Sequence, residues 1–295
     1  MRGDENRIAW MFVAPALALY ALFVMVPLCQ SFWFSLFDWN GYSQDMKFTG
    51  MRNYAALLRD GVFWGSLWRN IFLLAASLVV QLPIAIILAA LLAGPVRFAR
   101  VLRAGLFAPM ILPTVIVALL WIFIYDPVDG LLNGLLGGIG LQSLRRGWLG
   151  EATTALPAVT VAVCWRYTGF HMILFAAGIV NIPAETYEAA ELDGASAFAR
   201  FIHVTLPGLY PVIRVSALLS VVGSMKYFDL NYLMPSGGAP DRATELVATY
   251  MYREGINADR WGYGCAIAVA LCALTLATGG IKLWLDRRRS QPAGV

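Results

Sequence analysis

Six apolar runs, each roughly as long as a membrane-spanning helix, dominate this sequence. A helix needs about 20 apolar residues to cross the hydrocarbon core of a bilayer. Lipid offers no partner to unpaired backbone groups, and the runs are too long and continuous for the strands of a membrane barrel. The runs cover residues 8–37, 70–94, 106–125, 155–180, 209–228 and 263–285. They predict an all-α polytopic membrane protein in which residues 1–295 form a single transmembrane domain with six spans.

The composition supports this class and excludes others. Of the 295 residues, 59% are hydrophobic and 14% are charged, against about 45–50% and about 25% in soluble domains. The net charge of +4 therefore reports membrane topology and not nucleic-acid binding. All four cysteines lie in apolar runs without a C-x-x-C pair, which favours packing over disulfides or metal binding. The first run is too long for the core of a signal peptide, so we expect a retained span.

The arginines set the expected orientation. The linker 94–105 holds three arginines and no acid, and the tail 286–295 holds three arginines in a row. Basic residues concentrate on the cytoplasmic side of a membrane. With six spans, both termini, this linker and residues 181–207 then lie in the cytoplasm. The loops expected outside are 38–69, 127–154 and 229–262.

Prolines inside the spans predict bent helices. Each proline removes a backbone hydrogen bond and frees a carbonyl. Pro109 and Pro113 stand one turn apart, so the sequence predicts a kink in the third span. The other prolines within spans are Pro15, Pro27 and Pro83.

Residues 181–207, here called the acidic loop, are a polar exception between two apolar runs. Pro183 suits the first position of a helix, and Glu188 lies near the helix start, where the dipole favours acids. Gly194 predicts a break, after which Ser196 can cap a second short helix. The cytoplasmic leaflet is anionic and attracts bases, so the acids predict a protein partner with a basic and apolar groove. The alternative is an ordinary solvated loop, against which the ordered capping argues.

The acidic loop also carries a long motif, "YEAAELDGASAFARFIHVTLP" at 187–207. The triplet EAA at 188–190, Gly194 and VTLP at 204–207 resemble the cytoplasmic EAA signature of permease subunits of binding-protein-dependent ABC importers. The fuller string is similar to the carbohydrate-uptake branch, whose permeases resemble the first maltose-type permease subunit.

This resemblance implies a MetI-like, type I ABC importer permease and a role for the acidic loop. The loop is then the coupling helix, which docks in a cleft of a separate ATPase subunit. Glu188 pairs with a base there, Gly194 allows the turn, and Phe198 and Phe201 are seated in the cleft. The residues expected to serve coupling are Glu188, Ala189, Ala190, Asp193, Gly194, Phe198, Phe201, Leu206 and Pro207.

The resemblance also implies the partners. They are a second homologous permease in a heterodimer, two ATPase subunits and an extracytoplasmic sugar-binding protein, all at a bacterial cytoplasmic (inner) membrane. The ATPase subunits bind ATP and magnesium, so this chain is expected to hold no cofactor and to be no enzyme. It has no G-x-x-x-x-G-K-[ST] loop with which to hydrolyse ATP.

The fifth span has a polar face that suits a substrate. Ser220, Ser224 and Tyr227 stand at i, i+4 and i+7, on one side of a helix. Polar residues inside spans are costly and often functional, although serine in a membrane helix more often packs. A mostly polar, partly aromatic cavity would bind the hydroxyls and the C–H faces of a sugar. The resemblance places sugar-lining positions at Met110, Thr114, Val163, Arg166, Tyr167, Ser220, Ser224 and Tyr227.

Other ionisable groups near this face leave alternatives open. Arg166 could reach outward, pair with an acid such as Asp229, or attract an anionic sugar, and we rank the anionic sugar below the pair. Lys226 and Asp229 are expected to pair or to gate. His171 is expected to bond another helix more readily than a substrate.

The sequence therefore predicts a permease subunit of an ATP-driven importer for a sugar or sugar derivative. The alternatives are another polyol or an anionic sugar, such as a glycerol phosphate or a sulfosugar. A secondary transporter is more remote, because it needs acids within spans for its coupling ion and the central spans have none. An intramembrane serine enzyme would need a G-x-S-x-G elbow, which is absent.

Overall fold

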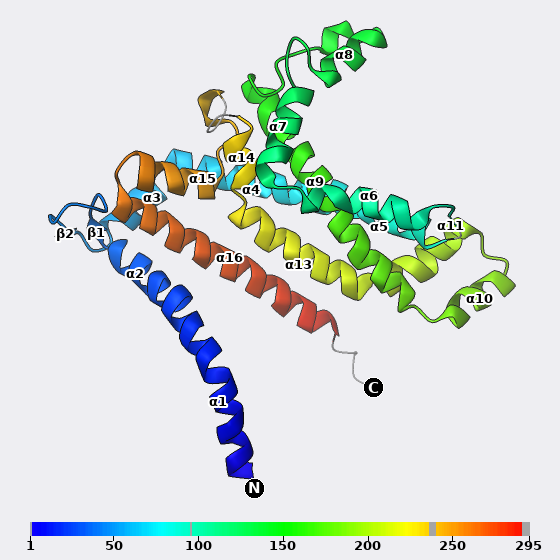
Figure 1. Cartoon of the computed structure of the whole chain (residues 1–295), viewed down its shortest axis with the longest axis horizontal. Helices are drawn as coiled ribbons and strands as arrows, with labels where there is room; N and C mark the ends of the chain where they lie inside the picture. Colours follow the sequence, from blue (N-terminus) through cyan, green and yellow to red (C-terminus); the bar gives the residue numbers. More distant parts are fainter. Residues whose placement is uncertain (1, 95, 236–239, 291–295) are drawn as a thin grey trace. The chain divides into compact units, whose positions relative to one another are not determined.

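A computed structural model describes residues 2–94, 96–235 and 240–290 (Figure 1). Among these residues, four helices are long and apolar enough to cross a membrane, and six spans result if each of two bent helix pairs counts as one. The protein is thus the all-α membrane protein that the apolar runs predict. Of the arginine-rich segments, Pro95 and residues 291–295 lie outside the described residues.

The chain divides into two compact units. The first comprises Met1–Phe63 and Tyr250–Leu274, and the second comprises Trp64–Thr249 and Thr275–Val295. The expectation of a single domain stays a prediction. Three helices have residues in both units: α4 (Gly61–Ala76), α15 (Val247–Tyr252) and α16 (Trp261–Ser290).

The first unit contains the first span and one short antiparallel strand pair, in which Phe37 lies opposite Phe48. Its remaining elements are α1 (Arg2–Tyr20), a π-helical turn (Ala21–Met25), α2 (Val26–Phe34), β1 (Phe37–Asp38), β2 (Lys47–Phe48), α3 (Arg52–Leu58) and a π-helical turn (Arg253–Asn257).

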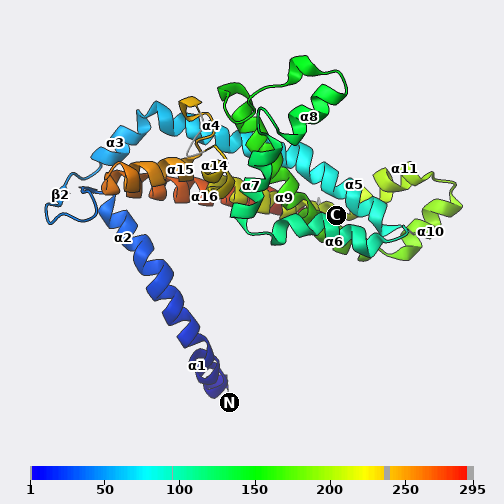
Figure 2. The same cartoon turned by 45° about the horizontal axis from the view of Figure 1, so that its top comes forward.

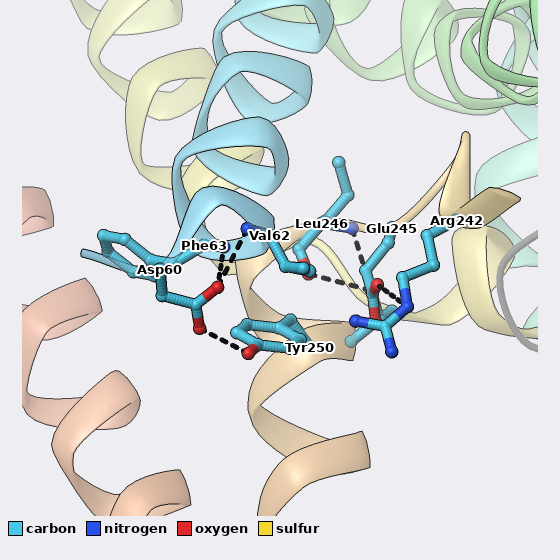
Figure 3. Close-up of polar contacts among 8 residues, drawn as sticks. Asp60, Val62, Phe63, Arg242, Glu245, Leu246 and Tyr250 are labelled. Atoms are coloured by element: carbon cyan, nitrogen blue, oxygen red, sulfur yellow. Dashed lines mark hydrogen bonds and ion pairs between the residues drawn. The ribbon is translucent and has the colours of Figure 1, made fainter. Parts of the chain in front are cut away.

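Asp60 caps the start of α4 and ties it to two tyrosines of the first unit. Its Oδ1 accepts hydrogen bonds from the backbone N–H groups of Val62 (2.9 Å) and Phe63 (3.4 Å), and its Oδ2 accepts from the Tyr250 hydroxyl (Figure 3). The Tyr263 hydroxyl also donates to Oδ2. Burial raises the pKa of this carboxyl, but the hydrogen bonds outweigh burial and leave the pKa below its ordinary value. The helix that contains the second apolar run therefore begins at Gly61, ahead of residue 70 where the predicted span starts.

The second unit is built around the long helix α9. Helices α5 and α6 pack along it and lie beside it in both views (Figure 1, Figure 2), and α13 also contacts it. The elements are a π-helical turn (Ser77–Gln81), α5 (Leu82–Ala93), α6 (Ala99–Ile111), α7 (Thr114–Ile124), α8 (Leu131–Gly138), a 3₁₀ turn (Gln142–Leu144), α9 (Ala152–Val180), α10 (Ala184–Leu192), α11 (Ala197–Arg200), a π-helical turn (Phe201–Thr205), α12 (Leu206–Gly208), α13 (Tyr210–Lys226), α14 (Asp229–Leu233) and a 3₁₀ turn (Pro240–Arg242).

Three helices widen into a π-helical turn just before a proline. In each turn, the next residue donates its N–H to a carbonyl five residues earlier instead of four. Proline lacks an N–H, and its ring crowds the carbonyl four residues before it, so the ladder opens there. The turns Ala21–Met25, Ser77–Gln81 and Phe201–Thr205 precede Pro27, Pro83 and Pro207 in this way.

The third span is broken more sharply than a kink. Helices α6 and α7 meet at 101° across Leu112 and Pro113, whose backbones are extended. The Arg166 side chain reaches this break from α9 and donates to Thr114 Oγ1 (2.7 Å) and to the Leu112 carbonyl (3.3 Å). It thereby satisfies a carbonyl that the break removes from the helix ladder. The fifth span also bends, by 65° between Ala197–Gly208 and Tyr210–Leu233.

Helices α6 and α9 approach most closely at Gly169. A Cβ atom added there would lie 2.0 Å from the Leu106 carbonyl oxygen, so only glycine fits. The cytoplasm-proximal half of the bent span, by the predicted orientation, is thus packed backbone to backbone against α9.

Candidate functional site

The acidic loop forms two short helices at a glycine turn. α10 ends at Leu192, Gly194 takes a left-handed φ of +76°, and α11 follows. Ser196 caps α11, since its Oγ accepts from the Ala199 N–H at 3.2 Å. The predicted helix–turn–helix is confirmed. Pro183 is one position off, because it precedes α10 as its N-cap residue.

The acids of the motif face solvent. Glu188 and Asp193 are exposed, as are Ala189 and Pro207. The Phe198 side chain is 74% exposed. The other expected coupling positions, Ala190, Phe201 and Leu206, are half-buried.

Contacts within the second unit hold the loop in place. The Tyr187 hydroxyl lies 3.0 Å from Thr205 Oγ1, and Arg200 pairs with Glu191 at 2.9 Å. One acid of the loop is therefore already neutralised, while neither Glu188 nor Asp193 has an ion pair among the described residues. Beside α11 lies a groove of about 790 Å³, lined on one side by Phe198 and Phe201 and on the other by the end of α5.

A second hollow lies among the π-helical turn of the second span, α9 and α13. This cavity measures about 390 Å³. Apolar and aromatic side chains line the cavity together with polar ones. The lining is therefore less polar than the sequence predicts. The lining residues are Leu73, Ser77, Gln81, Met110, Val163, Cys164, Tyr167, Phe170, His171, Leu219, Ser220, Gly223, Ser224, Lys226, Tyr227, Phe228 and Asp229.

Six of the eight positions expected to contact substrate lie in this lining. They are Met110, Val163, Tyr167, Ser220, Ser224 and Tyr227. The other two, Thr114 and Arg166, are not in the lining and bond each other at the break of the third span. The geometry gathers these residues, and their contact with a substrate stays a prediction.

Of the alternatives left open for Arg166, the ion pair with Asp229 is not formed among the described residues. The Arg166 side chain is 8% exposed, and its donors go to Thr114 and to the Leu112 carbonyl. Lys226 and Asp229 are both exposed at the cavity, and no ion pair joins them among the described residues. A helix-to-helix hydrogen bond from His171 is also not found, as its buried Nδ1 has no partner.

Sequence reasoning missed the wall that the second span contributes. Ser77 Oγ donates to Gln81 Oε1 (2.6 Å) and lies 2.9 Å from Ser220 Oγ. Gln81 Nε2 in turn donates to the Cys164 carbonyl at 3.4 Å. The spacing of Ser77 and Gln81, one helical turn apart just before Pro83, was the available signal.

Another missed residue is Asn70, which fixes the outer ends of these helices by the predicted orientation. It is fully buried, donates to the Ser224 carbonyl (2.5 Å) and accepts from the Val247 N–H (3.0 Å). Glu245 is fully buried, and the Arg242 Nε lies 3.8 Å from its carboxylate. Figure 3 shows the two side chains facing each other.

Aromatic rings frame the cavity. Tyr167 and Tyr227 meet edge to face with centroids 6.1 Å apart, and Phe170 meets His171 in the same way at 5.3 Å. The described residues bring together no group of three His, Cys, Asp or Glu side chains able to hold a metal ion. The cavity thus offers hydroxyl, amide, imidazole and aromatic groups, which suit the binding of a small molecule.

Two named relatives resemble this chain over nearly its full length. The diacetylchitobiose uptake system permease protein NgcF of Streptomyces coelicolor is 34% identical, over 94% of this chain and 81% of the relative. The lactose transport system permease protein LacF of Rhizobium radiobacter is 34% identical, over 95% of this chain and 94% of the relative.

The fold matches a solved importer. A chain of the bacterial alginate ABC transporter, solved with an alginate-pentasaccharide-bound periplasmic protein, superposes with a TM-score of 0.84 at 22% identity, over 99% of this chain and 98% of that one. The family model for the binding-protein-dependent transport system inner membrane component matches residues 81–291, which include the acidic loop and most of the cavity. The chain therefore belongs to the family of binding-protein-dependent transport system inner membrane components.

Proposed function

We propose that this permease carries a sugar or sugar derivative through a complex driven by ATP. In this complex the chain pairs with a second, homologous permease and is served by two ATPase subunits and an extracytoplasmic sugar-binding protein. Both termini and the acidic loop face the cytoplasm. ATP and magnesium bind the ATPase subunits, and this chain carries no cofactor.

The cavity among the second, fourth and fifth spans is the observation that carries the sugar assignment. Serine hydroxyls, the Gln81 amide and the His171 imidazole can exchange hydrogen bonds with sugar hydroxyls. The rings of Tyr167 and Tyr227 can pack against the C–H faces of a sugar. Relatives named for diacetylchitobiose and lactose support the same class of substrate.

The acidic loop couples ATP binding by the ATPase subunits to movement of the spans. Glu188 and the exposed Phe198 present one charge and one apolar ring to a partner, as a coupling helix requires. When the ATPase subunits close, α10 moves, and the end of α9 moves with it because only residues 181–183 separate the two helices. The spans then turn between inward-facing and outward-facing arrangements.

A neutral sugar fits the cavity better than an anionic one. Arg166, the buried base that could have attracted an anion, is committed to the break of the third span. Lys226 at the cavity is accompanied by Asp229, so the local charge balances. A glycerol phosphate, a sulfosugar or another polyol remains the alternative substrate.

The test is to purify the chain with its co-expressed neighbours in proteoliposomes and to measure ATP hydrolysis. Maltose, lactose, cellobiose and N,N′-diacetylchitobiose are offered with the cognate binding protein, and glycerol 3-phosphate and sulfate are included as anions. We expect one or more neutral sugars to stimulate hydrolysis through the binding protein. Stimulation by the anions alone, or sugar uptake driven by an ion gradient after ATP depletion, would contradict the proposal.

A further inference from the structure

The end of the cavity nearest the acidic loop is polar, and an apolar core begins directly beyond it. Both α5 and α9 run toward that loop, and Gln81 and His171 are the last residues that their spans contribute to the lining. The residues that follow, Leu82 and Met172, belong to a buried apolar cluster with Phe175. His171 therefore stands at the boundary between the cavity and the core.

His171 holds a hydrogen-bonding atom without a protein partner. Its side chain is 5% exposed, and its Nδ1 makes no hydrogen bond to any described residue. A buried polar atom left unpaired destabilises a protein, and the cost rises in hydrocarbon. The edge-to-face contact with Phe170 positions the ring but satisfies neither nitrogen. Because His171 also lines the cavity, a molecule bound there is the available source of a partner for the imidazole.

The neighbouring polar groups bond one another and not His171 in this structure. Ser77 donates to Gln81 and lies against Ser220, while the Gln81 amide turns to the Cys164 carbonyl. These bonds fix the wall beside His171, whose Nδ1 has no hydrogen bond to any described residue.

We propose that His171 is a substrate-binding residue, whose imidazole exchanges a hydrogen bond with a sugar hydroxyl at the end of the cavity nearest the acidic loop. The proposal rests on the proposed function of the cavity as a sugar site. A hydroxyl both donates and accepts, so it matches either tautomer of a neutral imidazole. Ser77 and Gln81 act as positioning residues, since they hold the adjoining wall through Ser220.

Cys164 provides a direct probe of whether a sugar occupies the cavity, because it lines the same cavity as His171 and lies on the same helix, α9. In the full complex, the other cysteines of this chain are changed (Cys29→Ala, Cys265→Ala and Cys272→Ala), and modification of Cys164 by N-ethylmaleimide is followed by mass spectrometry. Maltose, lactose, cellobiose and N,N′-diacetylchitobiose are titrated as protecting sugars. We expect a sugar that stimulates ATP hydrolysis to slow the modification.

The role of His171 is tested by the half-protection concentration, which is the sugar concentration that halves the rate of Cys164 modification. We expect His171→Ala to raise the half-protection concentration about threefold to tenfold, because one hydrogen bond to the sugar is lost. His171→Asn should recover part of this loss. The matched control is Thr160→Ala on the same helix, a buried hydroxyl that bonds the Leu156 carbonyl at 2.7 Å and does not line the cavity. It should leave half protection unchanged.

The possible failures are distinguishable. If sugars protect Cys164 equally in the parent and in His171→Ala, the role of His171 is wrong while the proposed function stands. If no sugar protects Cys164 in the parent, the sugar site is wrong, and the role of His171 falls with it. If His171→Ala does not assemble, His171→Asn is compared with His171→Leu, and equal protection in the two overturns the proposal.

Discussion

The acidic loop and the cavity both place polar side chains in an apolar chain, yet different forces hold them. In the loop, the contacts are local: Ser196 caps its own helix, and Arg200 reaches Glu191 nine residues back. In the cavity, the contacts join distant spans, as between Ser77 and Ser220. Glu188 and Asp193 of the loop face solvent, whereas Ser77, Gln81 and Ser220 of the cavity are buried.

This difference separates function from stability in the two regions. A loop whose shape is set by neighbouring residues can lose a solvent-facing charge and still fold. A cavity wall assembled from distant spans cannot lose a packing or bonding residue without disturbing the bundle. Substitutions in the loop should therefore change coupling alone, and substitutions around the cavity should change folding as well.

The largest effect is expected at Glu188. Glu188→Gln removes the exposed charge expected to pair with the ATPase subunit, and truncating one partner of a docked charge pair costs about 2–5 kcal/mol. We expect sugar-stimulated ATP hydrolysis and uptake to fall about 30-fold or more, with normal amounts of the chain in the membrane. Glu185→Gln, on the same helix but outside the motif, is the control. Equal losses in both variants would contradict a specific pairing.

Gly169 tests the other region, the packed helices around the cavity. Gly169→Ala puts a Cβ against the Leu106 carbonyl, which is backbone and cannot rotate away. Overpacking of this kind costs about 1–3 kcal/mol or more, so the chain should reach the membrane in low yield and unfold at a lower temperature. Gly105→Ala on α6, where nothing lies within 4 Å, should be tolerated. Thermal unfolding of the solubilised complex measures both.

Arg166 extends the comparison between the loop and the cavity, because this charged residue stabilises the break of the third span. Arg166→Met keeps the apolar stem but leaves the Leu112 carbonyl and Thr114 without their donor, at a cost of about 1–3 kcal/mol. Arg166→Lys should rescue poorly, because an ammonium cannot bridge both acceptors in the fork geometry of arginine. Thr114→Val removes one bond and should cost less than Arg166→Met. A stable Arg166→Met protein with altered sugar selectivity would instead place Arg166 in the substrate site.

The smallest effect is expected at Gly194. Gly194→Ala forces a side chain into the left-handed region, which costs about 1 kcal/mol, although no atom lies within 4 Å of the new Cβ. The loop should loosen locally, seen as faster amide hydrogen exchange in α10 and α11, while the unfolding temperature of the bundle stays unchanged. A fall in bundle stability would show that the loop is less independent than its contacts indicate.

The same contrast decides what the sequence could reveal. The loop was predictable residue by residue, from the break at Gly194 to the cap at Ser196, because each signal acts on its own neighbours. The presence of spanning helices was predictable from length and hydropathy, although the helix of the second begins at Gly61, after the cap at Asp60. The sharp break of the third span was visible only as a kink at its prolines.

The cavity was only partly predictable. The face formed by Ser220 and Ser224 follows from helical periodicity within one span. The contribution of Ser77 and Gln81 depends on which helix lies opposite, and the partner of Arg166 depends on a carbonyl 54 residues away. Such long-range pairings leave no mark in a local pattern, so the sequence left the partner of Arg166 open.

The π-helical turns before Pro27, Pro83 and Pro207 limit how these spans can change in length. Each holds one residue more than an α-helical turn, and one residue corresponds to a rotation of about 100° around the helix axis. Deleting a residue within Ser77–Gln81 would turn the start of the second span away from the cavity and separate Ser77 from Ser220. Insertions and deletions should therefore accumulate in the loops between spans, and the distance in sequence from Ser77 to Pro83 should be fixed even where the residues between them change.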